Sequence, residues 1–154
     1  MLLSELITPE AVVPSLKVNT KKRALEELSD RAGSISGLPP REIFDALLQR
    51  ERLGSTGIGA GIAIPHCRLA KAQAIFGLFA RLARPIDFHA FDNVPVDLIC
   101  LLIAPETAGA DHLKALACTA RMLREPKITG RLRAARDVVA LHALLTGEPA
   151  SHAA

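Results

Sequence analysis

Residues 50–67 read RERLGSTGIGAGIAIPHC, and within them the chain changes from a helical to an extended pattern. The first residues continue a helix, but four glycines between positions 54 and 61 end it, because glycine is poorly tolerated inside helices. The apolar run 62–65 then predicts a short extended segment that ends in a proline. The stretch therefore places the imidazole of His66 directly after a short, stiff extended segment.

Upstream of this stretch the pattern predicts two helices. Thr20 is a suitable N-cap for a helix from Lys21 to about Ala32, which we expect Gly33 to end. A pair of prolines opens a second helix over residues 41–52. Its apolar face is marked by residues three and four apart, namely Ile43, Phe44, Leu47 and Leu48.

Downstream, short apolar runs alternate with helical patterns. Residues 74–82 and 96–103 predict buried strands, residues 12–18 look extended, and residues 8–10 suggest a helical turn. Helices are expected from residue 110 or 111 to 123, from 126 to 135 and from 137 to 145, with a frayed tail over 147–154. Strands interleaved with helices predict an α/β fold in which helices pack on a small sheet.

Length and composition point to one soluble domain spanning residues 1–154. The chain has 154 residues, of which 49% are hydrophobic and 23% charged, so intrinsic disorder is excluded. The longest apolar run, Leu98–Ala104, is far shorter than a membrane helix, and the N-terminus lacks the layout of a signal peptide. Three cysteines without CxxC spacing argue against disulfides and zinc ribbons. We therefore expect a cytoplasmic protein without membrane insertion.

The residues around His66 suggest phosphoryl transfer. Glycine N–H groups can form an anion-binding concavity, and two arginines and two hydroxyls stand at the start of the same stretch. A P-loop is excluded by the missing GK[ST] ending, and a dinucleotide fingerprint is disfavoured because the glycines lead into a proline-ended strand. On this chemistry alone, glycines that serve turns and a structural histidine explain the pattern equally well.

The run IGAGIAIPH, residues 58–66, resembles the phosphohistidine signature of the fructose/mannitol-type enzyme IIA domains of the bacterial phosphotransferase system (PTS). GSTGIG, residues 54–59, looks most like the nitrogen-regulatory branch of that family. Three further segments resemble the same branch: KKRALE at 21–26, DNVPVDL at 92–98 and RLRAA at 131–135. The resemblance implies a single type 2 enzyme IIA domain over residues 1–154, with a small mixed sheet flanked by helices.

The resemblance also implies site residues. His66 matches the histidine that accepts the phosphoryl group, and His112 matches a second histidine beside it. Arg50 matches an arginine that helps to bind the phosphoryl group. Ser55 and Thr56 are candidate phosphoryl-binding hydroxyls, although both also suit an ordinary turn. A backbone carbonyl is expected to hold the second ring nitrogen of His66.

Two positions depart from the family pattern. Ala60 stands where relatives often carry a polar residue, and Cys67 replaces a common glycine. Cys67 also invites a Cys/His metal or catalytic site, but neighbours in an extended segment point to opposite faces, so no metal site is expected. Cys100 and Cys118 are expected in the core. The remaining histidines are expected to be surface or structural residues: His89, His142 and His152.

Function follows from the resemblance as an expectation. The protein would be a phosphocarrier of the nitrogen-related system that receives its phosphoryl group from an HPr-like phosphocarrier protein, and no cofactor is required. Its phosphorylation state would regulate protein targets such as potassium-transport or sensor-kinase proteins. One alternative is a sugar-specific enzyme IIA that passes the group to an enzyme IIB, and another is a binding protein without phosphotransfer. Whether such a phosphotransferase component counts as an enzyme is left open.

Basic residues near the C-terminus raise the separate hypothesis of nucleic-acid binding. Helical spacing spreads them around the surface with acidic residues among them, and the formal charge of the chain is only +3, so a solvated face or an acidic protein partner is favoured over nucleic acid. The residues are Arg121, Arg124, Lys127, Arg131, Arg133 and Arg136.

Overall fold

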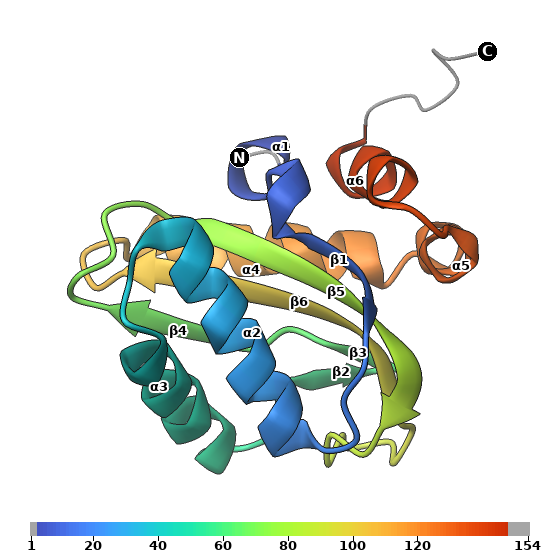
Figure 1. Ribbon diagram of the computed structural model, residues 1–154, viewed down its shortest axis with the longest axis horizontal. Coiled ribbons are helices and arrows are strands. Elements are labelled where there is room, and N and C mark those ends of the chain that lie inside the picture. Colours follow the sequence, from blue (N-terminus) through green and yellow to red (C-terminus); the bar gives the residue numbers. More distant parts are fainter. Residues whose placement is uncertain (1–2, 148–154) are drawn as a thin grey trace.

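A mixed β-sheet forms the middle layer of the protein, and helices cover both of its faces (Figure 1). The computed structural model describes residues 3–147. The strands are β1 (Val12–Leu16), β2 (Gly57–Gly59), β3 (Ile62–Ala63), β4 (His66–Leu69), β5 (Phe76–Ile86) and β6 (Val96–Pro105). The helices are α1 (Leu3–Leu6), the 3-10 turn η1 (Pro9–Ala11), α2 (Lys21–Ser36), α3 (Pro40–Arg52), α4 (Ala110–Leu123), α5 (Pro126–Ala134) and α6 (Val138–Thr146). The expected α/β fold with a small mixed sheet is confirmed.

Strand β6 is the centre of the sheet. It pairs with β5 in an antiparallel hairpin on one side, and with β3 and β4, both parallel to it, on the other. Beyond these, β1 runs parallel to β5 and β2 pairs antiparallel with β3. Strands β3 and β4 follow one another along the same edge of β6. Only two residues separate them, and His66 is the first residue of β4.

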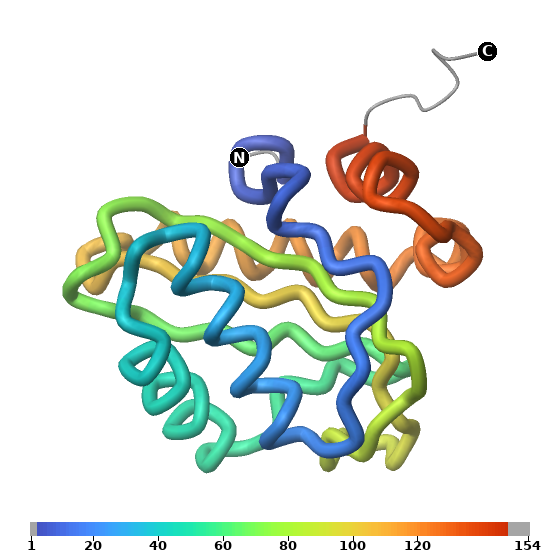
Figure 2. Tube along the Cα trace, viewed as in Figure 1, coloured from blue at the N-terminus to red at the C-terminus, as the bar shows by residue number. Residues whose placement is uncertain are grey.

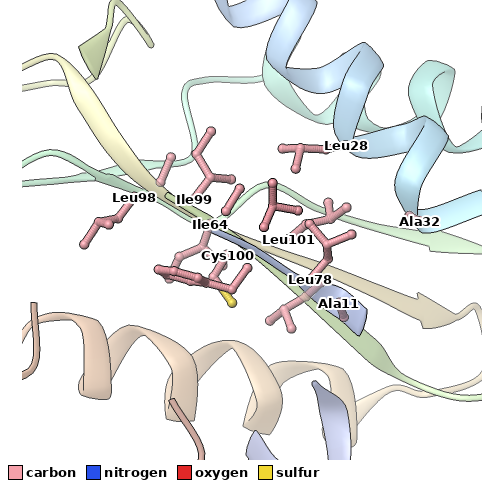
Figure 3. Close-up of a cluster of buried hydrophobic side chains, with 14 of the residues drawn as sticks. Ala11, Leu28, Ala32, Ile64, Leu78, Leu98, Ile99, Cys100 and Leu101 are labelled. Atoms are coloured by element: carbon pink, nitrogen blue, oxygen red, sulfur yellow. The ribbon is translucent and has the colours of Figure 1, made fainter. Parts of the chain in front are cut away.

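The core lies on both faces of β6, as its continuous apolar sequence predicts for a strand covered on two sides. Figure 3 shows Ile99 and Leu101 on the side of α2, near Leu28, whereas the sulfur of Cys100 points to the opposite side, where α4 lies. Leu28, Ile99 and Cys100 are fully buried, and Leu101 is 1% exposed. Burial of each of the aliphatic side chains contributes roughly 1.5–3 kcal/mol to the free energy of folding.

Helix α2 is longer than the sequence predicts. Thr20 caps it as expected, accepting a hydrogen bond from Arg23 N at 3.1 Å, but the helix continues through Gly33 and ends before Gly37, whose φ is 78°. Gly33 serves close packing instead: a Cβ built there would lie 2.6 Å from Cγ of Pro40 at the start of α3. The glycine that ends this helix is therefore Gly37.

The other elements follow the predictions with small shifts. Strand β5 runs on to Ile86, four residues beyond the predicted end, and helix α4 begins at residue 110 as expected. Gly147 closes α6 with φ 73°, and the rest of the predicted tail, residues 148–154, lies outside the described residues, as does His152. Among residues 3–147, no helix has the length and apolarity needed to cross a membrane.

The beginning and the end of the described chain lie side by side (Figure 2). Nε2 of His142 in α6 lies 2.9 Å from the carbonyl oxygen of Ile7, which follows α1. His142 therefore has a structural role, one of the two roles expected for it.

Candidate functional site

His66 is held in one orientation by its own strand connection. Its Nδ1 lies 2.8 Å from the carbonyl oxygen of Ile64, two residues earlier. Because a carbonyl can only accept, Nδ1 carries the ring hydrogen, and Nε2 keeps a free lone pair. The expected backbone partner for one ring nitrogen of His66 is confirmed, and Nε2 is the ring nitrogen that faces away from this bond.

Arg50 reaches His66 from the last turn of α3. Its Nε donates to Nε2 of His66 at 3.3 Å, and its Nη1 donates to the carbonyl oxygen of Gly54 at 2.9 Å. The second bond fixes the guanidinium on the first residues of the loop that leaves α3. Arg50 thus places its guanidinium directly against Nε2 of His66.

His112 approaches His66 from the first turn of α4. Its side chain is buried, and the ring centroids of His66 and His112 are 5.7 Å apart with the planes tilted by 52°. Nδ1 of His112 is buried and has no hydrogen-bond partner among the described residues. A buried ring nitrogen without a partner costs free energy, and few buried polar atoms in folded proteins lack one.

These side chains line a pocket of about 510 Å³ together with Arg68, which follows His66 by two residues on β4. Arg68 was not among the site residues predicted from the sequence, although strand alternation puts residues 66 and 68 on the same face. Gln49 and the exposed side chain of Leu53 contribute to the rim. The lining contains four basic or imidazole groups and no carboxylate, which is the composition of an anion-binding site.

The environment favours neutral imidazoles. Burial is the main cause that lowers the pKa of His66, and the charges of Arg50 and Arg68 lower it further, whereas the bond to Ile64 and the charge of Glu51 act in the other direction. Burial also lowers the pKa of His112, followed by the charges of Arg68 and His66. A neutral His66 with an available lone pair on Nε2 is the form required of a nucleophile.

Ser55 and Thr56 do not line this pocket. Ser55 Oγ donates to the carbonyl oxygen of Phe88 at 2.7 Å and accepts from Gly57 N at 3.1 Å. Thr56 is buried, and its hydroxyl donates to the carboxylate of Glu51, which also accepts from Thr56 N at 3.0 Å. Both hydroxyls are therefore engaged in hydrogen bonds within the protein. These bonds hold the loop after α3 against Phe88 and Glu51.

The glycine-rich loop folds into the β2–β3 hairpin instead of an open anion-binding concavity. Ala60 and Gly61 form its two-residue turn with φ values of 57° and 84°, as a type I′ turn requires. Ala60 N donates to Asp92 Oδ2 at 2.9 Å, and Ile64 N donates to the carbonyl oxygen of Thr56 at 3.0 Å. Of the glycine N–H groups in this stretch, that of Gly54 donates to the carbonyl oxygen of Glu51 at 3.1 Å and that of Gly57 donates to Ser55 Oγ at 3.1 Å, so these two are already bonded within the protein.

Cys67 points away from His66, as strand alternation predicts, and packs in the core at 6% exposure. Burial raises the pKa of its thiol to about 12, so the group is not a nucleophile near neutral pH. Cys100 is fully buried, and Cys118 is partly buried against the same core. Across residues 3–147, no three side chains of the His, Cys, Asp and Glu types are grouped so as to hold a metal ion.

Among the basic residues near the C-terminus, Arg133 is not part of a solvated face. It makes three hydrogen bonds to the carboxylate of Asp97 at 2.9–3.1 Å, and its Nη2 donates to the carbonyl oxygen of Ala60 at 2.8 Å. It therefore ties α5 to β6 and to the turn of the β2–β3 hairpin. The other five basic residues of that group are exposed.

Residues 5–147 match the model of a family described as "Phosphoenolpyruvate-dependent sugar phosphotransferase system, EIIA 2". The chain belongs to this family. It is 55% identical over 153 residues to the nitrogen regulatory protein of Bradyrhizobium diazoefficiens, with 99% of this chain and 100% of that protein covered. It is 41% identical over 145 residues to the nitrogen regulatory protein of Escherichia coli, with 94% and 89% covered. The predicted resemblance to the nitrogen-regulatory branch is confirmed.

Solved structures of the family agree with the fold. The nitrogen regulatory protein IIA-Ntr of Neisseria meningitidis superposes with a TM-score of 0.89 at 35% identity, covering 94% of this chain and 99% of that one. The mannitol enzyme IIA of Escherichia coli superposes with a TM-score of 0.77 at 20% identity, covering 90% of this chain and 98% of that one. This likeness shows only that the two proteins share a fold.

Proposed function

We propose that this enzyme IIA protein is a phosphocarrier of the nitrogen-related PTS that accepts a phosphoryl group on Nε2 of His66. The observation that carries the proposal is the fixed tautomer of His66: Nδ1 is bonded to Ile64, and Nε2 faces Arg50 inside a pocket without carboxylates. We treat residues 1–154 as one enzyme IIA domain, which the family match over residues 5–147 supports.

The geometry suggests how the transfer proceeds. The lone pair on Nε2 of His66 attacks the phosphorus of a phosphohistidine on an HPr-like carrier, the new N–P bond forms, and the donor's N–P bond breaks with its electron pair returning to the donor ring. The proton on Nδ1 stays on the bond to Ile64, so His66 needs no general base. Arg50 Nε–H moves from the ring nitrogen to a phosphoryl oxygen, and His112 faces the same group.

Regulation is the proposed output. Phosphorylation adds a charge of about −1.5 to −2 to a pocket lined by cations, so partners that recognise this surface would distinguish the two states. Such partners are regulatory proteins, for example of potassium transport or of the sensor-kinase class, as the resemblance to the nitrogen-regulatory branch implies. The proposed donor is a carrier protein that is phosphorylated with phosphoenolpyruvate. Because phosphoenolpyruvate is a cytoplasmic metabolite, we also propose a cytoplasmic location for this protein.

The test is intact mass after incubation with phosphoenolpyruvate, the first PTS enzyme and its histidine carrier. Wild type should gain one acid-labile phosphoryl group, His66→Ala should gain none, and His112→Ala should gain it more slowly. His89→Asn is the matched control, because His89 is exposed and asparagine tolerates its positive φ of 56°. Full phosphorylation of the His66 variant would refute the assignment.

A second candidate is a sugar-specific enzyme IIA that passes the group to an enzyme IIB. A 37% identity over 114 residues to the fructose-specific EIIA component of Haloferax volcanii, with 73% of this chain and 74% of that one covered, favours it. Loss of the phosphoryl group from charged wild-type protein to an added enzyme IIB would support the sugar-specific function, and retention would support the regulatory one.

A further inference from the structure

Strand β4 places Arg68 beside the reactive histidine. His66 pairs with Leu102 and Arg68 with Ala104 on β6, while Cys67 between them is turned into the core. Residues 66 and 68 therefore share a face, with a backbone separation of roughly 6.6 Å along the strand. An arginine side chain easily spans that distance, and Arg68 lines the same pocket as His66 and His112.

Arg68 differs from Arg50 and Lys21, the other cations close to the site, because its guanidinium is not bound to another residue. Arg50 is bound to Gly54 and His66, and Lys21 is bound to Glu51. Arg68 is exposed, and its side chain makes no hydrogen bond or ion pair with any residue between 3 and 147. Its charge nevertheless acts on both imidazoles and lowers the pKa of each. A free guanidinium close to two imidazoles is available for an incoming anion.

We infer that Arg68 is a phosphoryl-binding residue: its guanidinium pairs with the oxygens of the phosphoryl group on Nε2 of His66. The inference rests on the proposed function. Arg50 already contacts Nε2 before the transfer and acts on the approach of the donor, whereas Arg68 gains its partner only when the group has arrived. Arg68 therefore stabilises the phosphorylated state in particular. It shifts the equilibrium of phosphoryl transfer from the carrier toward phosphorylated His66.

The consequence is a division of roles that kinetics can separate. Loss of Arg68 should speed the return of the phosphoryl group to the carrier more than it slows the forward transfer. It should shift the phosphorylation equilibrium with the carrier toward the unphosphorylated protein by roughly tenfold, the value of one charge-assisted hydrogen bond at a partly exposed site. Arg68→Lys should recover part of the shift, because lysine keeps the charge but not the paired donors.

The experiment compares wild type, Arg68→Ala and Arg68→Lys by intact mass at equilibrium with a charged carrier, and by 31P NMR of the phosphohistidine. Arg84→Ala is the matched control, since Arg84 is an exposed arginine on β5 outside this pocket. We expect the full equilibrium shift in Arg68→Ala, a smaller shift in Arg68→Lys and none in Arg84→Ala. Arg68→Ala should also raise the pKa of the phosphoryl group, which a purely structural effect would not produce. Unchanged equilibrium and phosphoryl pKa would overturn the inference.

The two proposals fail in different ways. If wild-type protein takes up no phosphoryl group from a charged carrier, the proposed function fails and the role of Arg68 fails with it. If wild type is phosphorylated on His66 and Arg68→Ala matches it in equilibrium and in phosphoryl pKa, the proposed function stands and the role of Arg68 alone is refuted. An equal shift in Arg84→Ala would show a general effect of net charge and would also refute it.

Discussion

The ammonium group of Lys21 lies 2.9 Å from Oε1 of Glu51, and 15% and 3% of these two side chains are exposed. The pair joins the first residue of α2 to the last turn of α3, directly after Arg50. Because Glu51 also accepts from the N–H and hydroxyl of Thr56, one carboxylate connects both helices to the loop that leads to His66. The positions of Arg50 and of the loop that leads to His66 therefore depend on the buried Lys21–Glu51 pair.

Replacement of Glu51 by glutamine should cost about 3 kcal/mol in the free energy of unfolding, because it leaves Lys21 buried without a counter-charge. Urea denaturation measures the change. Glu42→Gln is the control: its pair with Lys71 is exposed, so a loss of at most about 1 kcal/mol is expected. Equal effects of the two substitutions would contradict the importance of the buried pair.

Loss of Arg133 should loosen the turn of the β2–β3 hairpin. Arg133→Ala removes the bonds to Asp97 and to the carbonyl oxygen of Ala60, and we expect a destabilisation of roughly 1–3 kcal/mol. Thermal unfolding measures it, and amide hydrogen exchange should show faster exchange in the hairpin. Arg131→Ala, an exposed neighbour on the same helix, should stay within about 0.5 kcal/mol of wild type. The prediction fails if the two variants are indistinguishable.

Ala60 occupies a turn position that suits asparagine better. Its φ of 57° is unfavourable for a residue with a Cβ, and asparagine is the preferred first residue of type I′ turns. Ala60→Asn should therefore raise the free energy of unfolding by about 0.5–1 kcal/mol. Ala60→Val, which is β-branched, should lower it, and the opposite order in chemical denaturation would refute the interpretation of this turn.

Two glycines inside helices should respond to alanine in opposite directions. Gly33→Ala places a Cβ 2.6 Å from Pro40 and 2.9 Å from the carbonyl oxygen of Leu38, so we expect a loss of roughly 1–3 kcal/mol. Gly130→Ala in α5 meets nothing within 4 Å and should gain about 0.5–1 kcal/mol from helix propensity. Denaturation midpoints with the same sign for both variants would exclude close packing at Gly33.

The protonation of His66 should set the pH dependence of phosphorylation and contribute to the pH dependence of stability. Its pKa lies below the usual 6.5, chiefly because of burial, so the reactive neutral form persists at pH 6.5 and protonation stops phosphorylation only at lower pH. The unfolded chain takes up this proton near pH 6.5, and the folded chain takes it up at lower pH. Stability contributed by the neutral ring is therefore complete above pH 6.5 and is lost as the pH falls through the folded pKa. NMR titration of the His66 ring checks this, and a midpoint at or above 6.5 would contradict it.

Much of the fold could be predicted from local patterns. The N-cap at Thr20, the apolar run of β6 and the helix starting at residue 110 are local signals, because capping, burial on two faces and helical spacing are all set by neighbouring residues. The end of α2 could not be predicted, since the role of Gly33 depends on Pro40 in the next helix.

The sequence by itself determined the family resemblance and the candidate site residues: a histidine after a proline-ended strand, with Arg50 and His112 matching family positions. Tertiary structure alone decided which nitrogen of His66 is free, which hydroxyls and N–H groups are already occupied, and that Arg68 joins the pocket without a partner. The physical reason is that local sequence fixes backbone conformation, whereas hydrogen-bond partners and charges at a site come from segments that only the folded sheet brings together.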